Sequence, residues 1–190
     1  MVTEQISYKN LPNLLTVTRI LAIPVVMVLL SFPSRWASFL GALCFSVAGA
    51  TDILDGFLAR RQRSVTPFGK FMDPLADKLL VSAALIMLIP LGRVPAWMVF
   101  IIIGRELMVT GLRGLAAVEG IILAPDRWGK TKTILQMVAI TALILHYPYQ
   151  AFDFQRLGMA LLWVALIVTV TSGVGYFMVF FRRTLLTEKA

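Results

Sequence analysis

Long apolar stretches separated by short polar turns run along the chain from residue 14 to residue 181. Each stretch has about the length that a helix needs to cross the ~30 Å hydrocarbon core of a bilayer. The pattern therefore predicts an all-α membrane protein with six transmembrane helices. The predicted spans are residues 14–32, 36–60, 69–90, 95–117, 131–147 and 157–181.

The N-terminal residues differ from these stretches. Residues 1–12 mix polar and apolar side chains and end at Pro12, so we expect an interfacial segment that lies along the membrane surface. Composition supports a membrane location, because 58% of the 190 residues are hydrophobic, whereas soluble domains have about 45–50% apolar residues. The length suits one membrane domain that comprises residues 1–190.

The basic residues are distributed unevenly. The formal net charge of +8 would suggest a nucleic-acid partner in a soluble chain. In an apolar chain, basic loops that fix membrane orientation explain it better, so we expect no nucleic acid. Six spans put both termini on one side, and only Arg35, Arg93 and Arg156 fall on the other. Because basic residues mark the cytoplasmic side, both termini and the turn at 61–68 are predicted to be cytoplasmic.

Four of the ten acidic residues lie in or beside the second and third spans. Asp52 and Asp55 are three residues apart and share one helix face, and Asp73 and Asp77 are four apart and share another. A short turn joins the two helices, so both pairs are expected to converge at the cytoplasmic end. Salt bridges to nearby basic residues are one explanation. Repulsion between four carboxylates favours bound cations instead, and oxygen ligands suit Mg²⁺ or Mn²⁺.

Small residues lie on the same two faces. Gly56 and Ala59 follow the first aspartate pair, and Gly69 precedes the second. Close helix packing is one explanation, and room for a flat ligand beside the metals is another that is compatible with it. Arg60 could contact a phosphate or extend to the membrane surface. Thr66 could cap the third helix or contact the ligand.

These residues together resemble a known signature. The segments 52–60 and 69–77 match that of the CDP-alcohol phosphotransferases at all eight defining positions: Asp52, Asp55, Gly56, Ala59, Arg60, Gly69, Asp73 and Asp77. The resemblance implies a six-helix fold, two metal ions and a cytidine pocket near Gly56, Arg60 and Thr66. It also implies that all four aspartates bind metal and that Asp77 acts as the general base.

The rest of the chain is most similar to bacterial phosphatidylglycerophosphate synthases. The resemblance implies CDP-diacylglycerol as donor, glycerol 3-phosphate as acceptor, phosphatidylglycerol phosphate and CMP as products, and the bacterial inner membrane as location. It makes Asn13 and Thr16, which are cap candidates at the start of the first span, possible nucleotide contacts. Cardiolipin and phosphatidylinositol-phosphate synthases are alternatives within the family. The similar stretches are residues 10–19, 71–80, 104–113 and 129–133.

Basic residues provide an independent reason to expect a phosphorylated acceptor. Arg105 and Arg113 are eight residues apart and share a helix face, and Lys130 and Lys132 open the fifth span. With Arg19 inside the first span, they predict a cationic zone that binds the acceptor phosphate. Positive-inside bias alone explains the lysines equally well. It explains Arg19 and Arg105 less well, because both lie within apolar sequence.

A transporter could also keep charged residues inside the membrane. Such a protein is expected to show paired broken helices or an internal repeat, and the sequence has neither pattern. The predicted partners are therefore the two substrates and membrane lipids. The oligomeric state stays open, with a homodimer among the alternatives.

Overall fold

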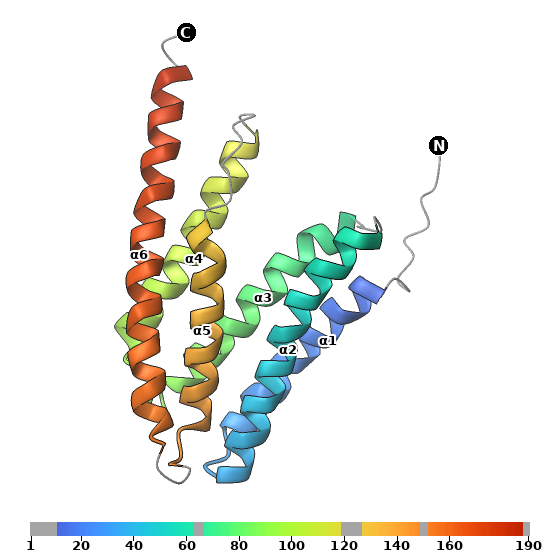
Figure 1. The fold of residues 1–190 in the computed structure, drawn as a ribbon, viewed down its shortest axis with the longest axis vertical. Coiled ribbons are helices and arrows are strands. Elements are labelled where there is room, and N and C mark those ends of the chain that lie inside the picture. The colour runs from blue at the N-terminus through green and yellow to red at the C-terminus, as the bar shows by residue number, and fades with distance from the viewer. Residues whose placement is uncertain (1–10, 63–66, 119–126, 149–151, 188–190) are drawn as a thin grey trace. The chain divides into compact units, whose positions relative to one another are not determined.

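The computed structural model describes residues 11–62, 67–118, 127–148 and 152–187. Six α-helices account for nearly all of these residues (Figure 1). The helices are α1 (Leu11–Leu30), α2 (Arg35–Gln62), α3 (Pro67–Leu88), α4 (Ala96–Val118), α5 (Arg127–Leu145) and α6 (Phe154–Thr187).

Each predicted span corresponds to one of these helices, so the all-α prediction is confirmed for the described part of the chain. Within it, one segment, Phe154–Phe181 of α6, is long and apolar enough by composition to cross a membrane. Thr16–Leu30 and Thr131–Leu145 are shorter apolar helices. Helices α2, α3 and α4 contain charged residues within their lengths. The helical fold is thus established, and six membrane crossings stay a prediction.

The chain divides into two compact units, Met1–Leu88 and Ile89–Ala190. In the first unit, α2 and α3 both pack along α1 and contact each other less extensively. Phe45 of α2 and Leu80 of α3 are fully buried in this unit. Helix α3 begins at Pro67, a residue that suits the first turn because its missing N–H would have no helical partner there.

In the second unit, α6 packs against both α5 and α4. The contact between α5 and α6 is close at Gly158, where a Cβ atom would lie 2.7 Å from Leu143 Cγ. Arg93 precedes α4 and reaches the end of α5, where Nη1 donates hydrogen bonds to the carbonyl oxygens of Leu143 (3.2 Å) and Ile144 (2.8 Å). Its own carbonyl accepts a hydrogen bond from Gln155 Nε2 at 2.9 Å. This arginine ties the chain before α4 to the ends of both other helices.

The second unit has an apolar surface, and its largely apolar interior also contains charged residues. Large apolar side chains of α6, including Trp163, Ile167 and Met178, are exposed. The buried set includes Arg105 and Lys132. Exposed apolar side chains suit a lipid environment, in which charged residues inside a helical bundle often mark a functional site.

Candidate functional site

The four aspartates lie on two helices of the first unit. Asp52 and Asp55 belong to α2, and Asp73 and Asp77 belong to α3. Both helices pack along α1. The Asp77 side chain is partly buried, and the other three side chains lie outside the described part. An all-carboxylate donor set fits Mg²⁺ or Mn²⁺, and the convergence of the four carboxylates stays a prediction.

The predicted nucleotide contacts belong to the same unit. Thr16 is buried on α1. Thr66 lies outside the described residues. The remaining five residues are on α1, α2 and α3, with side chains that are likewise not described: Asn13, Gly56, Ala59, Arg60 and Gly69.

Arg19 is a buried cation of the first unit, with 1% of its surface exposed. Its Nε donates a hydrogen bond to the carbonyl oxygen of Ala48 at 3.2 Å. The same carbonyl accepts the Thr51 hydroxyl at 2.7 Å. Because Ala48 lies one helical turn before Asp52, Arg19 is anchored on the turn of α2 that leads into the first aspartate pair.

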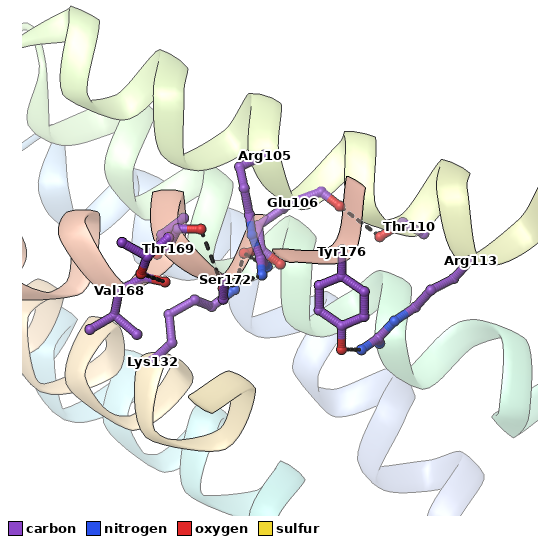
Figure 2. A network of polar contacts seen from close by, with 10 residues as sticks. Arg105, Glu106, Thr110, Arg113, Lys132, Val168, Thr169, Ser172 and Tyr176 are labelled. Atoms are coloured by element: carbon purple, nitrogen blue, oxygen red, sulfur yellow. Dashed lines mark hydrogen bonds and ion pairs between the residues drawn. The ribbon is translucent and has the colours of Figure 1, made fainter. Parts of the chain in front are cut away.

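A second cluster of charges lies among the helices of the second unit (Figure 2). Arg105 of α4 and Lys132 of α5 are buried, with 7% and 4% of their surfaces exposed. Both bind the carboxylate of Glu106: Arg105 Nη1 donates to Oε1 at 3.2 Å, and Lys132 Nζ contacts the same oxygen. One carboxylate oxygen thus links two buried cations from different helices.

Helix α6 positions the Arg105 side chain. Arg105 Nη2 donates a hydrogen bond to Ser172 Oγ at 2.5 Å, and that hydroxyl lies 3.3 Å from the Thr169 carbonyl oxygen. The Arg105 stem crosses α6 at Gly173, where a Cβ atom would lie 3.0 Å from Arg105 Cγ. Arg105 Nε is buried and has no hydrogen-bond partner in the part of the chain that the structure describes. The contacts with Glu106, Ser172 and Gly173 therefore hold the guanidinium in place.

Tyr176, one turn beyond Ser172, lies beside both arginines of α4 (Figure 2). Its ring centroid is 4.8 Å from Cζ of Arg113 and 5.9 Å from Cζ of Arg105. Its hydroxyl accepts a hydrogen bond from Arg113 Nη2. Both arginines therefore lie on the same side of α4, with Arg105 buried and Arg113 exposed.

Two more polar groups are buried one turn away from this cluster. Gln136 follows Lys132 by four residues on α5, and Thr169 precedes Ser172 by three on α6. Among the described residues, Gln136 Nε2 and Thr169 Oγ1 have no hydrogen-bond partner. Buried polar atoms are usually satisfied, so Gln136 and Thr169 are further polar groups in the interior beside the charged cluster.

The structure thus brings together three of the five predicted acceptor-phosphate residues: Arg105, Arg113 and Lys132. The Lys130 side chain lies outside the described part, and Arg19 belongs to the first unit. Sequence reasoning missed the roles of Glu106, Ser172, Gly173 and Tyr176. A signal was present in the polar pair Ser172 and Tyr176, four residues apart within the apolar sequence of α6.

Comparison with known proteins gives consistent findings. The model of the CDP-alcohol phosphatidyltransferase family matches residues 9–171. The chain is 46% identical to the CDP-diacylglycerol–glycerol-3-phosphate 3-phosphatidyltransferase of Bacillus subtilis, over 88% of this chain and 93% of that protein. Proteins of the same name from Rickettsia typhi and Pseudomonas fluorescens are each 41% identical. Those matches cover 89% and 88% of this chain, and 96% and 88% of the relatives.

Proposed function

Because the chain belongs to the CDP-alcohol phosphatidyltransferase family, we propose that it transfers the phosphatidyl group of CDP-diacylglycerol to glycerol 3-phosphate. The products are phosphatidylglycerol phosphate and CMP. Relatives at 41–46% identity over most of the chain are named for these two substrates. The buried pair Arg105 and Lys132 is the structural observation that supports a phosphorylated acceptor.

The acceptor phosphate binds at this cation pair. Burial of cations is costly unless anions accompany them, and the Glu106 carboxylate offsets only one of these two positive charges. A phosphate offers several acceptor oxygens for the donors of Arg105 and Lys132. Arg105 Nε supplies a further buried donor that no described residue uses. Arg113 lies on the same side of α4 and adds positive charge at an exposed position. Lys130 and Arg19 are assigned to the same zone from the sequence.

The aspartates serve the donor substrate. Asp52, Asp55, Asp73 and Asp77 are proposed to hold two Mg²⁺ or Mn²⁺ ions, for which their oxygen ligands are suited. When bound, such ions neutralise the diphosphate and stabilise the charge of the departing CMP. The CDP part of the lipid is assigned to the small and polar residues of α1, α2 and α3 and the turn between the last two: Asn13, Thr16, Gly56, Ala59, Arg60, Thr66 and Gly69.

The transfer itself needs one proton to move. Asp77 accepts the proton of the primary hydroxyl of glycerol 3-phosphate as that oxygen attacks the phosphorus that carries the diacylglycerol. The bond from that phosphorus to CMP breaks, so that the phosphatidyl group leaves the nucleotide for the acceptor. The partial burial of the Asp77 side chain on α3 suits a base that is screened from bulk water.

The proposed location is the bacterial inner membrane, which the chain crosses six times. Both termini and the active site are proposed to face the cytoplasm. The exposed apolar side chains of α6 and the membrane-length segment Phe154–Phe181 support membrane insertion. The positive-inside distribution of basic residues supports the orientation. A homodimer is compatible with this arrangement.

An acceptor panel tests the proposed function. The purified protein is incubated with CDP-diacylglycerol, Mg²⁺ and one acceptor at a time: glycerol 3-phosphate, inositol phosphate, serine or phosphatidylglycerol. Release of CMP and formation of the lipid product are measured together. Glycerol 3-phosphate should be the preferred acceptor, and excess EDTA should abolish turnover until Mg²⁺ or Mn²⁺ is restored. Preference for another acceptor would reject the assignment of substrate, and full activity in EDTA would reject the metal assignment.

A further inference from the structure

Among the described residues, Glu106 provides a negative charge beside the two buried cations. Its Oε1 binds both Arg105 Nη1 and Lys132 Nζ, and its side chain is only partly exposed. From α6, the uncharged side chains of Ser172 and Tyr176 contact Arg105. In the protein without substrate, this carboxylate therefore offsets the charge of Arg105 and Lys132.

A phosphate that binds the same two cations must use the same donors. Carboxylate and phosphate oxygens accept hydrogen bonds from guanidinium and ammonium groups in similar ways. The Arg105 Nη1 and Lys132 Nζ donors are already directed at Glu106 Oε1. The carboxylate thus lies where an oxygen of an incoming anion would be most strongly held.

We propose that the Glu106 carboxylate occupies the acceptor-phosphate site when no substrate is bound. The phosphate of the acceptor displaces this carboxylate from Arg105 and Lys132. This inference rests on the proposed function. It makes Glu106 a specificity-determining residue. A dianionic phosphate gains by replacing a monoanionic carboxylate, whereas an acceptor that ends in a carboxylate only exchanges one such group for another.

The variant Glu106→Gln separates this proposal from its main rival. If Glu106 competes with the substrate, its loss should lower the KM for glycerol 3-phosphate roughly tenfold or more, because a charge-assisted contact no longer has to be broken. The KM for CDP-diacylglycerol should stay within roughly twofold. If Glu106 instead only positions the two cations, its loss should raise the acceptor KM. A raised or unchanged acceptor KM would overturn the proposal.

Glycerate supplies a second readout, because it carries a carboxylate in place of the phosphate. It should inhibit the wild-type protein weakly and Glu106→Gln at least roughly tenfold more strongly. The matched control is Asp153→Asn, which removes an exposed carboxylate that pairs with Arg156 at 3.0 Å. Asn keeps a side-chain oxygen for the hydrogen bond from the Arg156 N–H. Asp153→Asn should have the same acceptor KM and the same inhibition by glycerate as the wild type. If glycerate inhibits Glu106→Gln and the wild type equally, the proposal is contradicted.

Glu106→Gln leaves two buried cations without their carboxylate, so folding is checked by thermal unfolding with and without inorganic phosphate. Under the proposal, phosphate stabilises this variant more than the wild type; equal stabilisation counts against it. Glu106→Asp keeps the charge but retracts it by about 1.5 Å, and should lower the acceptor KM by a smaller factor. If it raises the KM, Glu106 is a positioning residue.

The failure of this inference can be told from the failure of the proposed function. Arg105→Ala tests the phosphate site itself, because it removes donors that the phosphate uses whether or not Glu106 is displaced. If Arg105→Ala leaves the acceptor KM unchanged, the proposed phosphate site itself is wrong. If Arg105→Ala raises it while Glu106→Gln does not lower it, the site stands and only the displacement is rejected.

Discussion

Two buried arginines at different places in the second unit are held by different kinds of partner. Arg93 donates to the backbone carbonyls of Leu143 and Ile144 at the end of α5. Arg105 binds the side chains of Glu106 and Ser172 and keeps a buried Nε without a partner among the described residues. Terminal helix carbonyls need donors, so Arg93 completes the fold. Side-chain partners can move away, and Arg105 is therefore the arginine that we propose exchanges its partners for the acceptor phosphate.

Burial alone does not identify a functional arginine. Arg93 and Arg105 are nearly equally buried. The nature of their partners separates them: Arg93 binds backbone carbonyl oxygens, and Arg105 binds side chains. From this difference we propose a structural role for Arg93 and a binding role for Arg105.

The largest effect is expected from Arg105→Ala. It should raise the KM for glycerol 3-phosphate roughly ten- to a hundredfold, because a charge-assisted contact to the phosphate is lost. The KM for CDP-diacylglycerol should change far less. Steady-state kinetics with each substrate varied in turn provide the measurement. Arg105→Lys should recover part of the loss, since a point charge remains while the planar fork is lost.

Arg93→Met should show the opposite behaviour. Removing the guanidinium leaves the Leu143 and Ile144 carbonyls without this donor, which should cost about 1.5–3 kcal/mol of stability. Thermal unfolding in detergent should show a lower midpoint, and the folded fraction should keep the wild-type acceptor KM. A raised acceptor KM with an unchanged midpoint would remove the distinction between the two arginines.

Two glycines sharpen the comparison. In Gly158→Ala the new Cβ would lie 2.7 Å from Leu143 Cγ and 2.9 Å from its backbone nitrogen, so overpacking should cost about 1–3 kcal/mol of stability. In Gly173→Ala it would meet the flexible Arg105 stem at 3.0 Å. That variant should lose little stability but raise the acceptor KM severalfold. The measurements are the thermal unfolding midpoint and the acceptor KM of both variants. If the two variants change both quantities in the same way, the different roles of the two glycines are contradicted.

The smallest effect is expected from Tyr176→Phe. The hydroxyl that accepts the Arg113 hydrogen bond is lost, and the ring beside both arginines is kept. The acceptor KM should rise by roughly two- to fivefold, as expected for one neutral hydrogen-bond partner. Tyr176→Leu, which also removes the ring, should have a larger effect. If Phe and Leu behave alike, the ring does not position the arginines.

The sequence predicted the helices well because every span is a long apolar stretch. The helix ends were less predictable: α5 begins at Arg127 instead of residue 131, and α6 continues to Thr187 instead of residue 181. Hydropathy identifies only the apolar part of a helix. The backbone hydrogen bonds that define a helix continue into its polar ends.

The candidate site was predictable where a charge interrupts apolar sequence, as Arg105 does. Its partners were harder to find. Ser172 and Tyr176 lie more than 60 residues further along the chain, and α6 is apolar on most sides, so its sequence does not show which face meets α4. The reason for a glycine at position 173 becomes clear only in the structure, where the Arg105 side chain packs against it.

The most direct test is an equilibrium titration of glycerol 3-phosphate into three purified proteins in the presence of Mg²⁺: wild type, Lys132→Met and Arg93→Met. Both variants remove one buried positive charge from the second unit. Lys132→Met should bind the acceptor at least roughly tenfold more weakly, while Arg93→Met should keep the wild-type affinity. Equal affinity in all three proteins, or a loss confined to Arg93→Met, would contradict the central claim that Arg105 and Lys132 form the acceptor-phosphate site.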